Sequence, residues 1–321
     1  MKTYLLVMLL VGHVSGISSP YVNKAGESSP FPIQFSVPEA KIVKEIPKKR
    51  RDFAHIIPGQ FNTYIYSFES GYYRDYQQSY YAITTKKGGW DCLRHYEILA
   101  NGCIPYFIDL DDCPINTMYS LPKELIKEAM NLEGVSYLKI DHEKFNRKKY
   151  DEILNKLLEH TRKYLTTKNM AEYLLKKVDY FGTGSILYLS QDLGPDYLRC
   201  LMLAGLKELL GKRVIDVPKI EHIYTNYPLE KMQSLLGKGM TYTRVVEDLP
   251  IDRENIEQRI LNKEFDLIIY GSIHRGLLFH DLVLQNYESE KIVYICGEDD
   301  HSCKCGTLPI LFIRESSSLV P

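Results

Sequence analysis

The stretch Lys86-Lys87-Gly88-Gly89-Trp90-Asp91-Cys92-Leu93-Arg94-His95-Tyr96-Glu97-Ile98-Leu99-Ala100-Asn101-Gly102-Cys103-Ile104-Pro105 decides how the first half of the chain folds. Residues 80–85 before it are aromatic and β-branched and predict a strand, and residues 103–108 predict another. Between them, residues 93–100 carry an apolar face that predicts a helix, which Gly102 would end. The order of strand, Gly-Gly loop, helix and strand is that of a βαβ unit.

Several features of this unit favour a ligand that carries phosphate and sugar groups. The pair Gly88-Gly89 lets backbone amides approach a bound group, and the helix N-terminus that follows favours an anion. Lys86, Lys87 and Arg94 add positive charge, and the carboxylate of Glu97 can accept hydrogen bonds from sugar hydroxyls. The pattern predicts a nucleotide-sugar site. The alternative is a plain βαβ unit with a glycine turn and solvated lysines, because no full dinucleotide fingerprint follows.

Residues 94–105 resemble the donor-site helix of exostosin-like and other GT-B glycosyltransferases. The wider stretch 31–125 is also similar to exostosin-like proteins of bacteria and large viruses. The resemblance implies that Glu97 holds the donor ribose, while basic groups and loop amides hold the diphosphate. The chain departs from the broader GT-B pattern at Gly89, where a second glutamate is absent. The expected donor-binding residues are Lys86, Lys87, Gly88, Gly89, Asp91, Arg94 and Glu97.

The second half of the chain repeats the alternation of strands and helices. Near-continuous apolar strands are expected at residues 185–190, 214–217, 265–271, 291–296 and 310–313, with helices at 195–210 and 277–287. Such strands predict a parallel sheet covered on both faces, and ligands bind beyond the carboxyl ends of its strands.

That edge of the sheet carries the remaining site candidates. Asp192 and His274 follow strands and are candidate general bases for an acceptor hydroxyl. The alternatives are a helix cap for Asp192 and a structural role for His274. The other rim residues of this acceptor side are Arg275, Glu298 and His301. If the two halves form one enzyme, the cleft between them has Arg94 and Glu97 on one wall and Asp192, His274 and Glu298 on the other.

The region between the two halves is expected to be mostly helical. Residues 122–132 predict a helix with proline at its first turn. Residues 150–178 predict two helices with a break near Thr166-Thr167. Strands are expected at residues 136–140 and, ahead of the central unit, at residues 61–68, where apolar side chains alternate.

The fold class that follows is α/β, with two Rossmann-like domains that contain parallel sheets, as in GT-B enzymes. We expect a donor-side domain over 53–179, an acceptor-side domain over 180–315 and a tail over 316–321. The second half resembles the N-terminal, acceptor-side domain of exostosin-like proteins, so the domain order is inverted. A circular permutation, a piece of a tandem array or a misassembled gene would each explain this order, and the tail favours truncation.

The N-terminal residues predict a secretory signal peptide over 1–16. Lys2 precedes an apolar run over 4–12, which is too short to span a membrane, and small residues follow it. The alternative is a first buried strand. Residues 17–52 are expected to be a linker or extended segment. A signal peptide implies the secretory pathway or secretion, and a cytoplasmic location follows without one.

Composition and cysteine usage exclude some partners and cofactors. The net charge of −1 over 321 residues argues against a nucleic acid or an anionic membrane as the dominant electrostatic partner. The seven cysteines leave at least one unpaired, and reduced thiols are expected. The spacing of Cys296, Cys303 and Cys305 does not fit a structural zinc site. No metal and no cofactor are expected, since glycosyl transfer in the GT-B fold needs none.

The function that these patterns predict is transfer of a sugar from a nucleotide-sugar donor to a hydroxyl of a glycan, protein or small molecule. An alternative is a non-catalytic relic that binds a nucleotide-sugar or a carbohydrate. A nicotinamide-dependent Rossmann enzyme is less favoured, because neither half carries the glycine fingerprint with a downstream acid.

Overall fold

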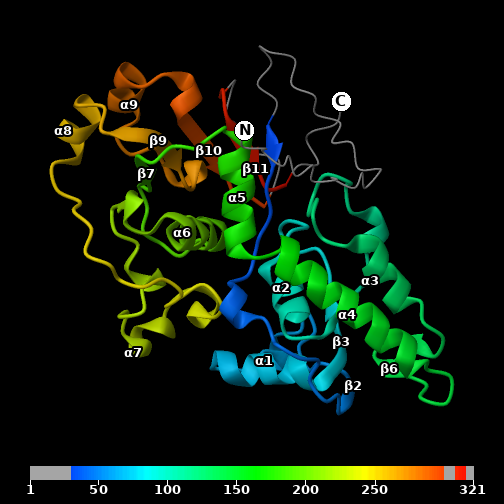
Figure 1. Ribbon diagram of the computed structural model, residues 1–321. Coiled ribbons are helices and arrows are strands. Elements are labelled where there is room, and N and C mark those ends of the chain that lie inside the picture. Colours follow the sequence, from blue (N-terminus) through cyan, green and yellow to red (C-terminus); the bar gives the residue numbers. More distant parts are fainter. Residues whose placement is uncertain (1–29, 300–307, 316–321) are drawn as a thin grey trace, which may run out of the picture.

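The computed structural model describes residues 30–299 and 308–315, and it contains two parallel sheets (Figure 1). The predicted signal peptide, the C-terminal tail and His301 lie outside these residues. The larger sheet has the strand order β1-β11-β10-β9-β7-β8 with every neighbouring pair parallel. Its strands are β1 (Phe31–Pro32), β7 (Ser185–Leu189), β8 (Val214–Val217), β9 (Phe265–Tyr270), β10 (Ile292–Cys296) and β11 (Leu311–Ile313). The five strands expected in the second half are confirmed.

The larger sheet is covered on both faces, as its apolar strands predicted. Alternate residues such as Ile186 and Tyr188 pack in one cluster with α5 (Thr167–Lys177) and α6 (Tyr197–Leu210). Leu187 and Leu189 belong to a second cluster with α8 (Ile256–Leu261) and α9 (His280–Asn286). The helices of this half are α6 (Tyr197–Leu210), α7 (Leu229–Met232), α8 (Ile256–Leu261) and α9 (His280–Asn286).

The smaller sheet contains the predicted βαβ unit. Its order is β2-β3-β4, all parallel, and its strands are β2 (Arg51–Phe53), β3 (Ser79–Thr84) and β4 (Ile104–Phe107). Helix α1 (Glu69–Gln78) connects the first two strands and α2 (Leu93–Ala100) the last two. Helix α2 ends before Gly102, whose φ of 64° is in the left-handed region that glycine tolerates best. The strand, helix and strand expected here are confirmed.

The expected strand over residues 61–68 is wrong. Residues Phe61–Thr63 form a 3-10 turn, and α1 begins at Glu69. The apolar side chains that suggested the strand are exposed, with Phe61 88% and Phe68 70% accessible, so their alternation marks no buried face. The expected strand over 136–140 is instead a short hairpin of β5 (Val135–Ser136) and β6 (Lys139–Ile140).

Three helices lead from the smaller sheet back to the larger one. They are α3 (Lys123–Met130), α4 (Arg147–Tyr164) and α5 (Thr167–Lys177). The predicted break lies at Thr166, whose side chain accepts a hydrogen bond from the Asn169 amide and caps α5. None of the helices within the described residues is long and apolar enough to cross a membrane.

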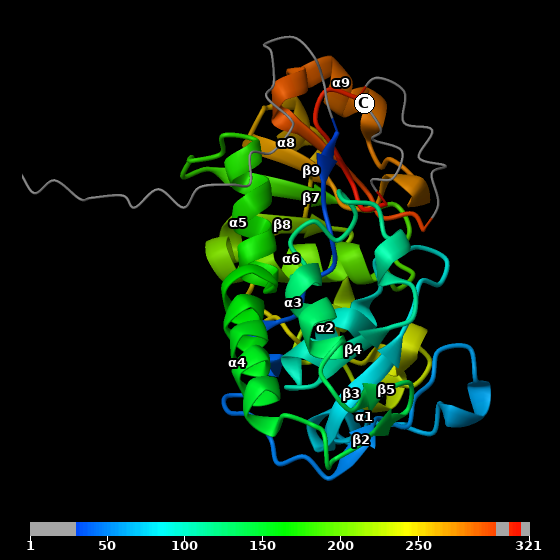
Figure 2. The ribbon, with the colours of Figure 1, turned by 90° about the vertical axis from the view of Figure 1, so that its right-hand side faces the viewer.

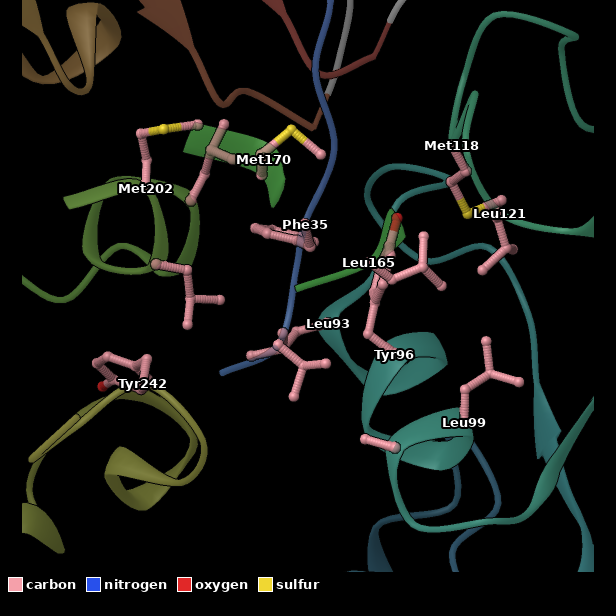
Figure 3. Packing of buried hydrophobic residues seen from close by; sticks show 14 of the residues in the cluster. Phe35, Leu93, Tyr96, Leu99, Met118, Leu121, Leu165, Met170, Met202 and Tyr242 are labelled. Atoms are coloured by element: carbon pink, nitrogen blue, oxygen red, sulfur yellow. The ribbon is translucent and has the colours of Figure 1, made fainter. Parts of the chain in front are cut away.

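The two sheets share one continuous hydrophobic core. Tyr81 and Ile83 of the smaller sheet belong to the same cluster as Ile186 and Tyr188 of the larger one. Figure 3 shows Phe35, on the segment after β1, between side chains of α5 and α6 and side chains of α2. This segment begins at the edge of the larger sheet, because Phe31 pairs with Phe312, and runs to β2 of the smaller sheet.

The cysteines differ from the expectation of reduced thiols at one position. Cys296, at the end of β10, is disulfide-bonded. The free cysteines among the described residues are Cys92, Cys103, Cys113 and Cys200. Within the same residues, no group of three histidine, cysteine or carboxylate side chains could hold a metal ion.

Candidate functional site

A cavity of about 630 Å³ lies between the two halves of the chain. Ligand pockets commonly occupy ~300–1,000 Å³, so its size suits an organic ligand. Arg94 and Glu97 of α2 line one wall, and His274 and Glu298 line the other. Other residues expected from the sequence also line the cavity, namely Lys87, Gly88, Gly89, Asp91 and Arg275. Lys86 and Asp192 are not among its lining residues.

The strand order explains why the second wall lies where it does. Five strands of the larger sheet lie in the spatial order β8-β7-β9-β10-β11. When β7 to β11 are numbered 1 to 5 along the chain, this is the order 2-1-3-4-5 of doubly wound sheets. In such sheets the chain connections leave β7 and β9 in opposite directions, which opens a crevice at their carboxyl ends. The residue Asp196 follows β7 and His274 follows β9, so the topology brings the two side chains together.

Arg94 is an enclosed cation without a carboxylate partner. Its Nη2 donates to the hydroxyl of Tyr64 at 3.3 Å, its guanidinium lies 5.5 Å from that ring, and its buried Nε has no hydrogen bond. No ion pair among the described residues includes Arg94. Burial acts to lower the pKa of Arg94, but interactions with the hydroxyls of Tyr76, Tyr72 and Tyr64 outweigh burial and raise this pKa above its usual value. The group therefore stays charged and can accept an anionic ligand.

Lys87 contacts the same hydroxyl of Tyr64 as Arg94 does. Its Nζ donates to the Tyr64 hydroxyl at 2.9 Å and lies 5.3 Å from the centre of that ring. Burial acts to raise the pKa of Tyr64, but the Lys87 hydrogen bond and the Arg94 charge together hold it below 10.0. Two cations that donate to one oxygen mark a point of positive potential at this end of the cavity.

Gly88 and Gly89 lie so close to carboxylates of the second half that a side chain at either position would meet them. A Cβ at Gly88 would lie 2.4 Å from Oδ2 of Asp299, and one at Gly89 would lie 2.4 Å from Oε1 of Glu315. The glycines thus allow a close approach between the two halves, in addition to the phosphate contact that the sequence predicts. Lys86 is exposed and lies 5.4 Å from the Trp90 ring.

Asp91 joins the loop to the segment that follows β1. Its carboxylate is buried and accepts from the Phe35 amide and from the Tyr96 hydroxyl, both at 2.7 Å. Burial raises the pKa of Asp91 to about 7, against the opposing charge of Arg314. Both carboxylate oxygens are engaged within the protein, so the geometry gives Asp91 a structural function at the edge of the cavity.

Glu97 is buried at the cavity wall and contacts both halves. Its Oε2 accepts from the Tyr72 hydroxyl at 2.5 Å, and its Oε1 accepts from the hydroxyl of Thr241 in the second half. Burial raises the pKa of Glu97, and the two hydroxyl donors oppose this effect. A carboxylate has about four acceptor positions, so Glu97 keeps capacity for further hydroxyls.

Arg314 is a site residue that sequence reasoning missed. Its guanidinium is fully buried and donates to the carbonyls of Asp91 and Gly297 and to the side chains of Asp299 and Glu315. It thereby fixes the loop before α2 to the ends of β10 and β11. The only sequence signal was a basic residue directly after the expected strand 310–313.

The second wall contains a histidine held by a buried carboxylate. Nε2 of His274 lies 3.4 Å from Oδ2 of Asp196 and 3.7 Å from Oε1 of Glu298, while Ser272 donates to Asp196 at 2.7 Å. Burial opposes ionisation of Asp196, but the hydrogen bonds from His274, the Arg199 amide and Ser272 hold its pKa well below 3.8. Nδ1 of His274 has no partner among the described residues, so it can contact a ligand.

Asp192 has a different environment from the one that the sequence suggested. It accepts from the Gly194 amide at 2.6 Å and pairs with Arg275 at 2.9 Å, and its side chain is 49% exposed. The cap of α6 is Asp196, which accepts from the Arg199 amide at 3.0 Å.

Comparisons of the chain with family models, with curated proteins and with solved structures found no match. The resemblance to exostosin-like proteins therefore stands on the residues quoted for it.

Proposed function

We propose that this protein is a glycosyltransferase that moves a sugar from a nucleotide-sugar donor to a hydroxyl acceptor in the cavity. The observation that carries this proposal is the half-buried Arg94 guanidinium, which makes no ion pair within residues 30–299 and 308–315 and which shares its end of the cavity with Lys87. Removing a cation from water costs free energy unless an anion pairs with it. A bound diphosphate would supply that anion.

The donor end of the cavity suits the rest of such a ligand. Glu97 lies three residues after Arg94 on α2, so both side chains come from adjacent turns of one helix. In the proposed complex Glu97 accepts hydrogen bonds from the ribose while Arg94 and Lys87 bind the diphosphate. The tyrosines Tyr64, Tyr66 and Tyr72 line the same region and offer aromatic surface for a base or sugar.

The acceptor end supplies a base. We assign Nδ1 of His274 to accept the proton of the acceptor hydroxyl while that oxygen forms a bond to the sugar carbon. The bond from this carbon to the diphosphate oxygen breaks, and the diphosphate leaves with the electron pair next to Arg94 and Lys87. Asp196 keeps the imidazole oriented and stabilises its positive charge after proton transfer.

The two sheets then correspond to the two halves of a GT-B-like enzyme. The smaller sheet carries the proposed donor residues and precedes every strand of the larger sheet except the edge strand β1, so we propose an inverted domain order.

The test is a turnover assay with a panel of nucleotide-sugars, in which release of the nucleoside diphosphate is measured with and without hydroxyl acceptors. His274→Asn should lower turnover by ~10²–10⁴-fold, the usual contribution of a general base, and leave donor binding within about twofold. His280→Asn is the matched control, because His280 lies outside the cavity and forms a hydrogen bond with the hydroxyl of Tyr294. Equal loss in both variants would contradict the assignment of His274.

A non-catalytic binding protein is the second candidate function. The observation that favours it is that both oxygens of Glu97 already accept hydrogen bonds from Tyr72 and Thr241. The absence of a glutamate at Gly89 points the same way. Donor binding without turnover of any nucleotide-sugar supports this alternative, whereas transfer that Glu97→Ala abolishes excludes it.

A further inference from the structure

Two loops meet at the mouth of the cavity, and we name them the aromatic loop (57–68) and the facing loop (229–240). Nε2 of Gln233 donates to the carbonyl of Ser67 at 2.8 Å, and Nζ of Lys238 donates to the carbonyl of Tyr66 at 2.8 Å. Both loops also line the cavity, through Tyr64 and Tyr66 on one side and Leu236 and Lys238 on the other. Their outer surface is therefore continuous with the cavity entrance.

The outer surface of these loops is apolar to an unusual degree. In Figure 2 the segment between β2 and α1, which includes the aromatic loop, projects from the body of the molecule. The large apolar side chains that the two loops expose to water are Phe61 (88%), Ile65 (61%), Phe68 (70%), Leu229 (64%) and Leu236 (53%). Single exposed apolar residues are ordinary, but a group on two contacting loops marks an interaction site.

The charged side chains on the two loops are predominantly positive. The aromatic loop contains no charged residue over positions 57–68, and the facing loop contains Glu230, Lys231 and Lys238. Lys87 adds a further cation, because its Nζ contacts the Tyr64 hydroxyl of the aromatic loop. Neither Lys87 nor Lys231 has a carboxylate within ion-pairing distance among residues 30–299 and 308–315. The mouth thus combines apolar tips with unpaired lysines.

We propose that the mouth of the cavity docks on a membrane surface that contains anionic lipids. Apolar side chains on projecting loops insert at the boundary between head groups and acyl chains, and neighbouring lysines pair with anionic head groups. The net charge of −1 excludes a long-range electrostatic attraction between the whole chain and an anionic membrane. Binding therefore rests on the local combination of apolar side chains and lysines. The cavity then faces the lipid surface and takes its acceptor there.

A membrane is favoured over a protein partner by the shape and chemistry of the surface. Separate apolar tips on loops are suited to a fluid interface, whereas a protein interface needs a shaped and largely desolvated patch with matched polar groups. Lysine is also depleted in the cores of protein interfaces, while it contributes favourably next to anionic lipids.

The experiment is co-sedimentation of the protein with vesicles of phosphatidylcholine alone or of phosphatidylcholine with phosphatidylserine. The wild-type protein should bind the phosphatidylserine vesicles more tightly, and added salt should weaken this binding. The double variant Phe61→Ser, Phe68→Ser should lower the partition coefficient by about tenfold or more, since two large apolar side chains no longer insert. Lys231→Gln should lower it by about fivefold on the anionic vesicles only.

The matched control is the double variant Ile115→Ser, Phe181→Ser, whose side chains are 86% and 80% exposed away from both loops. It should bind vesicles like the wild type. Absence of vesicle binding, or equal loss in the control, overturns the proposal. A concentration-dependent dimer that the Phe61→Ser, Phe68→Ser variant abolishes would assign the surface to self-association instead. Nucleoside diphosphate binding by the same variant is measured separately, so failure of the membrane proposal is distinguishable from failure of the proposed function.

Discussion

Two arginines that line the cavity, the fully buried Arg314 and the half-buried Arg94, differ in how their charges are satisfied. Arg314 donates to two backbone carbonyls and two carboxylates of the surrounding loops. Within the part of the chain that the structure describes, Arg94 donates only to the hydroxyl of Tyr64 and leaves its Nε without a partner. Burial of a charge costs several kcal/mol unless partners offset it, so the two side chains cannot serve the same purpose. The first arginine stabilises the contacts between the two halves, and we propose that the second binds an anionic ligand.

The same contrast extends to the regions around the two arginines. After β10 and β11, the side chains of Asp299 and Glu315 approach the loop before α2, where glycines leave room for them. Arg314 neutralises these two carboxylates. At the α2 wall, Lys87 and Arg94 share one phenol oxygen and no carboxylate. We call the Arg314 side the neutralised wall and the α2 side the uncompensated wall, because Arg94 and Lys87 make no ion pair within the described residues, although Arg94 interacts at longer range with Glu97. An anionic ligand is therefore proposed to bind at the second wall.

The largest expected effect is on stability at the neutralised wall. Arg314→Met removes a cation from the buried carboxylate of Glu315, which should lower the free energy of unfolding by about 3–5 kcal/mol. Urea unfolding at neutral pH measures this loss. Arg213→Met is the control, because Arg213 makes one exposed contact to the Gly182 carbonyl, and its effect should stay within about 0.5 kcal/mol. Equal effects of the two variants would contradict the structural assignment of Arg314.

The next effect is a pH dependence that Asp91 introduces. Its pKa of about 7 is above its usual value, because the carboxyl is buried. The folded protein therefore binds this proton more tightly than the unfolded chain does. The resulting stabilisation is complete below about pH 4 and is lost as the pH rises through about 7.

Asp91→Asn isolates this contribution, because the amide does not titrate. Between about pH 4 and about pH 8, the unfolding free energy of the wild-type protein should fall relative to that of the variant by roughly 3 kcal/mol. Chemical unfolding of both proteins at the two pH values measures the difference. A gap between the two proteins that does not change with pH would show that burial does not raise the pKa of Asp91.

A smaller effect of opposite sign is expected at the uncompensated wall. Arg94→Met removes a buried charge without a carboxylate partner, so the free energy of unfolding of the ligand-free protein should stay level or rise by up to about 1 kcal/mol. Thermal unfolding without added nucleotide is the measurement. A loss as large as that of Arg314→Met would remove the distinction between the two arginines.

The smallest effect is expected at Asp192. Its ion pair with Arg275 is half-exposed, and such pairs contribute about 0–1 kcal/mol. Asp192→Asn should therefore change stability by less than about 0.5 kcal/mol and leave turnover near that of the wild type. If turnover falls while stability is unchanged, the general base is Asp192 and not His274.

The parts of the fold that could be predicted from the sequence are those with local signals. The βαβ unit around α2 follows from a strand pattern, an apolar helical face and Gly102. The break between α4 and α5 follows from a threonine cap, and the five strands of the second half follow from continuous apolar runs. The strand expected at 61–68 failed because its alternating apolar residues point into solvent at the cavity mouth.

The parts of the candidate site that could not be predicted depend on distant chain segments. Arg314 meets the loop before α2 across 223 positions of sequence, and Thr241 meets Glu97 across 144. Asp196 reaches His274 only because β7 and β9 are neighbours in the sheet. Spacing along the chain contains no information on such contacts, so residues of the correct chemical type were named while their partners were missed.

The most direct test of the central claim is calorimetric titration of a panel of nucleoside diphosphates into the wild-type protein, Arg94→Met and the control Arg213→Met. At least one nucleotide should bind the wild type and the control equally. Arg94→Met should bind the same nucleotide about 10–100-fold more weakly, the equivalent of about 1.5–3 kcal/mol for a hydrogen bond to a charged group. Binding of no nucleotide, or equal affinity of the Arg94→Met protein, would contradict the account.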